Sequence, residues 1–264
     1  MDRQIELGYL VLGYLTSQLC SPNPIMLVKI QLCPACQSQA IVKNGHTRHG
    51  NQRVKCHDCG ATRVLMPKKK PVDLPALQRA LRERLSLRGV ARVFKVSLQT
   101  VLLVVKLTTQ RLPNFRDSVQ KAHKQDVIEF DEVWSYVHDK QQERWLWTAI
   151  SRRTRQIIAW SLGDHSRETF KQLLRKMPNE YRRCVSYSDA WRAYDVLLKS
   201  SARHQKVGKE TGETAHMERW NNTLRQRLSR YVRKALSFSK TDMFHHLTTK
   251  LFIWHYNMER INTF

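Results

Sequence analysis

Four cysteines near the start of the chain lie in two pairs whose spacing is typical of a metal site. The pairs are Cys33-Pro-Ala-Cys36 and Cys56-His-Asp-Cys59, with 19 residues between them. Two intervening residues let each pair form a tight turn, so that four thiolates can converge tetrahedrally on one Zn²⁺ ion. Between the pairs, β-rich stretches around Gly45 and Gly50 predict a hairpin. The sequence therefore predicts a zinc ribbon with one structural zinc ion.

Paired cysteines have two other common uses, which are structural disulfides and a thioredoxin-like redox pair. The chain does not begin with the pattern of a signal peptide, which disfavours secreted disulfides, and a redox motif would not occur twice at this interval. His46, His49 and His57 are possible substitute ligands, although four cysteines already complete a tetrahedron. Cys20 and Cys184 lie outside the pattern, and we expect them to be buried or incidental thiols.

Three carboxylates in the second half of the chain are candidates for a second kind of metal site. Asp131 lies within an apolar predicted strand, Asp189 ends another, and Glu218 lies on a predicted helix rich in Arg. Brought together, these groups would repel one another and have raised pKa values unless a cation bound them. Two Mg²⁺ ions ~3.5 to 4 Å apart would activate a water or a 3′-hydroxyl and stabilise the leaving oxygen of a phosphoryl transfer.

Each of the three acids also has a purely structural explanation. Asp131 could pair with a buried arginine, and Asp189 could cap a following helix. Glu218 could pair with Arg219 or Arg225 on its own helix. The residues alone therefore leave metal binding and structural pairing open for each acid.

Other acids compete for the same role. Glu129 and Glu132 are neighbours of Asp131 in the predicted strand, and we expect both to point to the other face of the sheet. Asp164 and Asp195 remain unassigned.

The elements that must position these acids alternate between strand and helix from residue 126 onward. We expect strands at 127–137, 144–150, 156–162 and 184–189, helices at 167–176 and 190–198, a long helix from about Thr214, and an apolar packed helix at 251–257. Three strands in sequence with short turns predict an antiparallel meander. The order of strand, strand, strand, helix, strand and helix is that of a ribonuclease-H-like fold.

Between the cysteines and the acids lies the most basic part of the chain. From Arg63 to Lys124 there are 15 Lys and Arg against three acids. Ser86 and Ser97 are expected to cap two short helices joined by a turn, the layout of a helix-turn-helix. The second helix would enter the major groove of DNA, with these candidate DNA contacts: Arg88, Arg92, Lys95, Gln99 and Thr100. The alternative is a small helical bundle with a solvated basic surface.

The charge of the whole chain indicates a polyanionic partner. Lys and Arg number 46 against 22 Asp and Glu in 264 residues, a formal net charge of +24. No run approaches the ~20 consecutive apolar residues of a membrane span. We therefore expect nucleic acid rather than a membrane as the partner.

Taken in order, these motifs resemble the transposases of the insertion-sequence-one family, in the fused InsAB form. The likeness covers about residues 26–257. It is carried by the two cysteine pairs, the helix-turn-helix and the following segments: Phe-Asp131-Glu-Val-Trp-Ser-Tyr-Val, Ser-Asp189-Ala-Trp, His-Met-Glu218-Arg-Trp-Asn-Asn-Thr-Leu and Arg-Lys-Ala-Leu-Ser-Phe-Ser-Lys240.

The resemblance implies a DDE transposase that binds the inverted repeats of its own element, cleaves there and joins the 3′ ends to target DNA. It gives Asp131, Asp189 and Glu218 the catalytic, Mg²⁺-binding roles. It places Arg225 on a DNA phosphate, and the basic stripe that continues through Arg227 and Arg230 would track the backbone. We further expect a homodimer or larger assembly on DNA. We also expect the protein to be cytoplasmic and nucleoid-associated in a prokaryote.

We therefore expect a multidomain α+β protein. Its parts are an extension of unknown role at 1–25, a zinc ribbon at 26–66, a helix-turn-helix region at 72–112 and a ribonuclease-H-like α/β catalytic domain at 126–264, with linkers at 67–71 and 112–125. Two rival functions remain: a non-catalytic DNA-binding regulator, and a structure-selective nuclease that cuts without joining ends.

Overall fold

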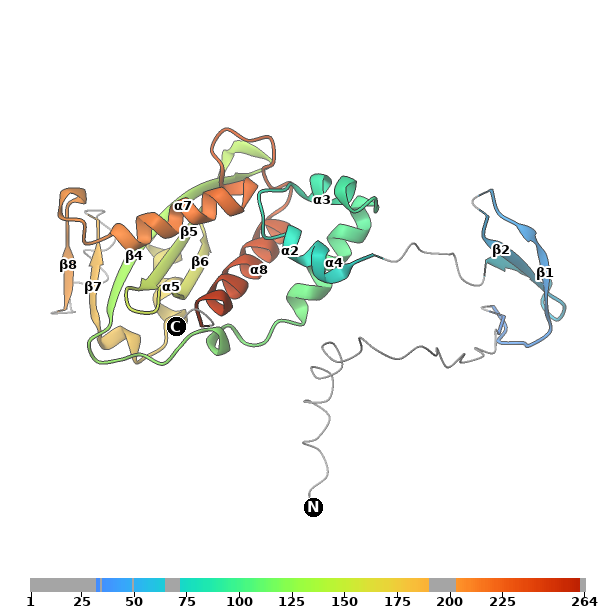
Figure 1. Cartoon of the computed structure of the whole chain (residues 1–264), viewed down its shortest axis with the longest axis horizontal. Coiled ribbons are helices and arrows are strands. Elements are labelled where there is room, and N and C mark those ends of the chain that lie inside the picture. The colour runs from blue at the N-terminus through green and yellow to red at the C-terminus, as the bar shows by residue number, and fades with distance from the viewer. Residues whose placement is uncertain (1–31, 34, 49, 65–71, 190–202, 262–264) are drawn as a thin grey trace, which may run out of the picture. The chain divides into compact units, whose positions relative to one another are not determined.

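The chain divides into two compact units, with the boundary in the sequence between Pro71 and Val72 (Figure 1). The computed structural model describes residues 32–33, 35–48, 50–64, 72–189 and 203–261. The expected extension at 1–25 and the expected helix at 190–198 lie outside the described residues. Within the described parts, no helix combines the length and the apolar character that crossing a membrane requires.

The first unit is a small antiparallel sheet beside the cysteines. Its strands are β1 (Ile41–His46), β2 (Gln52–Cys56) and β3 (Thr62–Val64), in the order β1-β2-β3. The expected hairpin is β1 with β2, and a register shift between Lys43 and His46 interrupts it. Gly45 and Gly50 both have positive φ, a conformation that glycine adopts at little cost. The third strand was not predicted from the sequence.

The second unit is built on a five-stranded sheet. In chain order its strands are β4 (Val127–Val137), β5 (Asp139–Ser151), β6 (Ile157–Gly163), β7 (Val185–Ser188) and β8 (His204–Lys206). Their spatial order is β6-β5-β4-β7-β8. The first three pair antiparallel, as the predicted meander requires, whereas β7 and β8 are parallel to their neighbours. The expected strands therefore form with ends shifted by a few residues.

Helices cover both faces of this sheet, because each strand alternates apolar side chains between them. On one face α7 (Ala215–Arg227) and α8 (Asp242–Ile261) pack through Trp220, Leu224 and Phe252. On the other face α5 (Arg167–Lys176) packs through Phe170 and Leu173. The unit is therefore mixed α/β with a core on each side of its sheet.

Three further helices precede the sheet: α2 (Leu74–Ala80), α3 (Leu87–Val93) and α4 (Leu98–Gln110). The two expected caps form, since Ser86 Oγ accepts the N–H of Gly89 and Ser97 Oγ accepts the N–H of Thr100. Lys95 occupies the turn between α3 and α4 with a positive φ of 52°. The helix α2 was not expected from the sequence.

These three helices share a core with the sheet-bearing part, although the sequence suggested separate domains at 72–112 and 126–264. Leu251 of α8 is buried in the same cluster as Leu77, Val90 and Val101. The expected linker at 112–125 contains a short helix, η1 (Phe115–Ser118), and is bound to the sheet. Gln156 Nε2 donates to the Ser118 carbonyl at 2.9 Å. The shared core and these hydrogen bonds make 72–264 one compact unit.

Candidate active site and cysteine cluster

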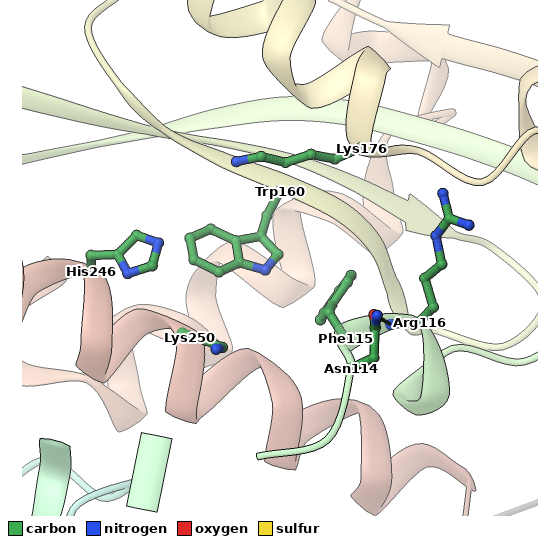
Figure 2. Close-up of a pocket in the computed structure, with 7 residues that line it drawn as sticks. All are labelled: Asn114, Phe115, Arg116, Trp160, Lys176, His246 and Lys250. Atoms are coloured by element: carbon green, nitrogen blue, oxygen red, sulfur yellow. Dashed lines mark hydrogen bonds between the residues drawn. The ribbon is translucent and has the colours of Figure 1, made fainter. Parts of the chain in front are cut away.

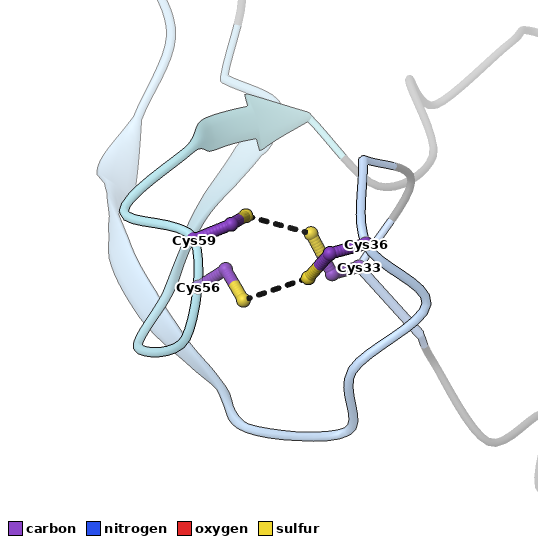
Figure 3. A group of neighbouring side chains, drawn as sticks. All are labelled: Cys33, Cys36, Cys56 and Cys59. Atoms are coloured by element: carbon purple, nitrogen blue, oxygen red, sulfur yellow. Dashed lines mark hydrogen bonds between the residues drawn. The ribbon is translucent and has the colours of Figure 1, made fainter.

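The four paired cysteines converge between the loop that precedes β1 and the turn that links β2 to β3 (Figure 3). The sulfur of Cys33 lies 3.6 Å from that of Cys59, and the sulfur of Cys36 lies 3.6 Å from that of Cys56. A tetrahedral zinc ion with ~2.3 Å bonds separates its sulfur ligands by about 3.8 Å, whereas a disulfide separates them by about 2 Å. The arrangement therefore fits a metal ion and does not fit two disulfides.

Backbone hydrogen bonds lower the pKa of one thiol in this cluster. Hydrogen bonds from the backbone of Ala35 and Cys36 lower the pKa of the Cys33 thiol to about 6. A thiolate is the form that ligates zinc, so this lowering of the pKa favours metal binding at Cys33. The cluster could bind zinc with an all-sulfur ligand set.

The acidic site forms where the parallel strands β4 and β7 separate. Their pairing places Ile128 opposite Ser186 and Glu129 opposite Tyr187, and it ends there. Continuing the same register by two residues brings Asp131 beside Asp189. The sheet topology therefore joins two acids that lie far apart in the chain.

A third carboxylate in this group is that of Glu132. Carboxylate oxygens of Asp131, Glu132 and Asp189 all lie within 4.8 Å of one another. Glu132 shares a face with its cross-strand partner Trp147, as the alternation of the strand predicts. Its longer side chain still reaches the group, since β7 no longer flanks β4 at this level. An all-oxygen set of this kind suits a hard cation such as Mg²⁺.

Glu132 is in turn held by an aromatic stack. Its Oε1 lies 3.2 Å from His165 Nε2. The His165 ring stacks on Trp145, with ring centroids 4.1 Å apart, and on Trp147, at 5.3 Å. This contact fixes the carboxylate at the border of the acidic group.

Glu129 lies on the same face as Asp131, and the expectation that it points away was wrong. Residues two apart in a strand share a face, and Glu129 and Asp131 obey this rule. The buried Glu129 carboxylate accepts the backbone N–H of Met217 at 2.9 Å and contacts His216 Nδ1 at 2.6 Å. Arg152 Nε donates to it at 2.9 Å. Glu129 thus binds the positive end of α7 to β4 and acts as a structural acid.

The helix α7 brings its own polar residues over Asp131. Asn221 Nδ2 donates a hydrogen bond to Asp131 Oδ2. Glu218 lies three residues earlier, on the same side of the helix, and its side chain is exposed. The structure therefore gathers Asp131 with Asp189, and it places Glu218 one helical turn from the residue that contacts Asp131, outside the closest group of carboxylates.

Of the two unassigned acids, the structure describes Asp164. Asp164 accepts hydrogen bonds from Ser166 and Thr169 at the start of α5, and these bonds lower the pKa of its carboxyl. Asp195 lies outside the described residues. Asp164 therefore holds the hydroxyl of Ser166, the N-cap of α5, and that of Thr169.

Comparison with known proteins agrees with this geometry. The family model described as IS1 transposase matches residues 126–258, which include Asp131, Asp189 and Glu218. This match spans half of the chain. The chain belongs to the IS1 transposase family.

Individual members of the IS1 family are similar over the same fraction of the chain. The InsB protein of insertion element IS1 from Shigella flexneri is 36% identical over 117 residues, which is 44% of this chain and 86% of that protein. The InsB protein of iso-IS1n from Shigella dysenteriae is 32% identical over 132 residues, 48% of this chain and 93% of its own length. Membership in a transposase family implies that DNA is a partner.

The three basic residues expected to contact phosphate, Arg225, Arg227 and Arg230, have different surroundings. Arg225 is partly buried, and the charge of Asp131 acts on it. Arg227 pairs with Glu259 at 2.7 Å and with Glu83 at 3.1 Å, so it links α8 to the segment between α2 and α3.

Arg230 follows α7 and is fully enclosed. Its guanidinium donates to Ser239 Oγ at 3.0 Å and to the Phe244 carbonyl at 3.3 Å. Burial lowers its pKa to about 10. Arg227 and Arg230 thus support the fold, and among the three expected phosphate contacts only Arg225 lies near the acidic site.

The residues expected to contact DNA from the helix pair are accessible. Arg88, Arg92, Lys95 and Gln99 are exposed, and Thr100 is partly exposed with its hydroxyl 2.9 Å from Ser97 Oγ. Three of these side chains carry a positive charge and surround the start of α4.

The pKa of Asp131 predicts how the site of this IS1-family protein responds to pH without Mg²⁺. Burial, followed by repulsion from Glu132 and Asp189, raises the pKa of Asp131 to about 7. In the unfolded chain the same carboxyl ionises near pH ~4. Stability therefore falls as pH rises through the interval between these values and stays reduced above it, because only the folded state resists ionisation.

We expect Asp131→Asn to remove this loss. Between pH 5 and pH 8, the wild type should lose on the order of 2 kcal/mol more than the variant, or about 5 °C in Tm, since Asp131 keeps partial contact with solvent. Thermal melts in buffer lacking Mg²⁺, with zinc retained, measure this difference. Equal pH dependence of the two proteins would contradict it.

Proposed function

We propose that this protein is a DNA transposase that binds the terminal inverted repeats of its insertion sequence, cleaves the ends and transfers the 3′ strands to target DNA. The observation that carries the proposal is the convergence of carboxylates where β4 and β7 separate. In this proposal residues 126–264 form a ribonuclease-H-like catalytic domain. Membership in the IS1 transposase family supports the same reading of the site.

The catalytic residues in this proposal are Asp131, Asp189 and Glu218, which would together hold two Mg²⁺ ions. Bound Mg²⁺ would activate the attacking oxygen and stabilise the leaving oxygen of an in-line phosphoryl transfer. Asn221 holds one oxygen of Asp131 by a hydrogen bond from α7. Glu218 approaches from α7, one turn before Asn221.

Three other residues support these acids in different ways. Glu129 binds the start of α7 to β4 and thereby sets the height of Glu218 above the sheet. Arg225, two turns beyond Glu218 on the same helix, would hold a DNA phosphate next to Asp131. Glu132 adds negative charge at the border of the site.

DNA recognition is assigned to the other elements. The helices α3 and α4 would act as a helix-turn-helix, with Gln99 near base edges and Arg88, Arg92 and Lys95 on phosphates. The cysteine cluster would hold one structural Zn²⁺. Because two element ends must be handled together, the acting form would be a homodimer or a larger assembly on DNA.

The proposal is tested by strand cleavage and joining with the purified full-length protein. The substrate is DNA that carries the flanking ends of the element, with Mg²⁺ and a target plasmid, and products are separated on denaturing gels. We expect end-specific nicks followed by joined products, none of which form when Mg²⁺ is omitted.

Two other outcomes would replace the proposal. Cleavage without joining, under conditions in which the ends are bound, would favour a nuclease. Binding of the ends without cleavage would favour a DNA-binding regulator.

A further inference from the structure

A basic hollow lies beside the edge strand β6, two strands from β4 and its acidic group (Figure 2). Its volume is about 370 Å³. The residues that line it come from the segment at η1, from β6, from the end of α5 and from the first half of α8: Asn114, Phe115, Arg116, Trp160, Lys176, His246 and Lys250. No acid is among them.

Trp160 forms the floor of this hollow and arranges its charges. The Lys176 ammonium lies 5.7 Å from the centre of the Trp160 ring, and the His246 ring lies 5.2 Å from it. Figure 2 shows Lys176 above the indole and Lys250 on the opposite side of it. Because Trp160 is buried, its ring gives Lys176 and His246 a fixed surface to pack on.

The cations of the hollow have no counter-charge. In the described part of the chain, no carboxylate lies within ion-pair distance of Lys176, Lys250 or Arg116. Burial alone lowers the pKa of Lys176, and burial followed by Lys176 and Lys250 lowers the pKa of His246. An anion in the hollow would relieve this repulsion, whereas a neutral or apolar ligand would not.

The hollow is also close to the acidic site. Trp160 pairs with Thr148 of β5, and Thr148 pairs with Asp131 of β4, so all three residues lie in one row and on one face of the sheet. Two strand spacings correspond to ~10 Å between the backbones of β4 and β6. Thr148 is buried against Met217 of α7, so DNA that contacted both places would pass over this helix.

We propose that this hollow binds one backbone phosphate of the DNA, with Lys176 and Lys250 as its principal contacts. The inference rests on the proposed function, because it takes DNA as the substrate at the acidic site. It adds a contact that holds the DNA on the side of the sheet opposite to β7. Asn114, exposed at the rim, is a further donor for a phosphate oxygen.

The test compares two pairs of substitutions in the full-length protein. Lys176→Gln with Lys250→Gln removes two charges from the hollow, and Lys140→Gln with Lys171→Gln removes two from exposed positions elsewhere. Binding of end-bearing DNA is measured by fluorescence anisotropy over a series of salt concentrations. Loss of one phosphate contact should lower the slope of log K against log salt by about one and weaken binding about fivefold. The control pair should change binding less than about twofold.

A second measurement needs no variant. Acetylation of lysines in the wild type, followed by mass spectrometry, should be slower at Lys176 and Lys250 when DNA is present and unchanged at Lys140. Inorganic phosphate at the same phosphate concentration should protect weakly, because it lacks the other contacts of the strand.

Three outcomes would overturn the inference: equal losses in both substituted pairs, no protection of Lys176 and Lys250 by DNA, or protection by inorganic phosphate as strong as that by DNA. Failure of the wild type to bind DNA at all would instead remove the proposed function. Thermal melts of both double variants check that each is folded. If one is not folded, the acetylation experiment on the wild type decides between the outcomes.

Discussion

Asp189→Asn is expected to slow strand cleavage and joining by on the order of 10³-fold, while the fold and the binding of DNA ends persist. Asparagine keeps the size of the side chain and removes the negative charge that a divalent cation requires. Asp189 lies beside Asp131 and Glu132, so the substitution leaves two carboxylates where three are gathered to hold a cation. Rates on end-bearing DNA at saturating Mg²⁺, with anisotropy for binding, measure the effect.

A matched pair of substitutions separates the two candidates for the third ligand. We expect Glu218→Gln to be as damaging as Asp189→Asn, and Glu132→Gln to cost only about tenfold, because Glu132 is engaged by His165. The reverse ranking would assign the third position to Glu132 and contradict the role proposed for Glu218. Unchanged joining by Asp189→Asn would contradict the acidic site altogether.

Cys36→Ser is expected to remove bound zinc and to unfold the first unit. Among its described residues, the buried apolar side chains are only Cys33, Val54 and Cys56, too few to form a core. Structural zinc contributes roughly 10 kcal/mol or more to the folding of small domains of this kind. Zinc content measured by atomic emission should fall from about one ion per chain to near zero, and trypsin should cleave the strands β1 and β2 rapidly.

Cys184→Ser is the control for this change. Cys184 is buried in the second unit, against α5 and away from the cluster, so the variant should keep its zinc. Thiol titration in denaturant, after removal of zinc, adds an independent check, since all cysteines should react. Missing thiols in the wild type would indicate disulfides, and full zinc content in Cys36→Ser would show that this residue is not a ligand.

Local features of the chain could be predicted because neighbouring residues encode them. The cysteine spacing, the caps Ser86 and Ser97 and the long apolar strand around Asp131 each depend on a few adjacent side chains. Their positions agree with the structure to within a few residues at the ends. The pairing of β4 with β7, which brings Asp189 beside Asp131, was expected only through the order of the elements.

The role of individual charges was much less predictable. Arg227 and Arg230 continue the basic stripe that begins at Arg225, and the sequence alone suggests that all three bind phosphate. In the structure, Arg227 pairs with Glu83 and Glu259. Arg230 is enclosed and donates to Ser239 and Phe244. Their partners lie up to 144 residues away in the chain. Nothing in the surrounding sequence distinguishes them from Arg225.

The sequence by itself determined the types of site this protein carries, a thiolate cluster and a set of acids in a strongly basic chain, because residue type and local spacing define both. The tertiary structure alone decided which acids meet. Glu129 supports α7, Glu132 reaches the acidic group, and the row from Asp131 to Trp160 leads to the basic hollow. The physical reason is that strand register and helix packing bring together residues whose separation in the chain carries no trace of their contact.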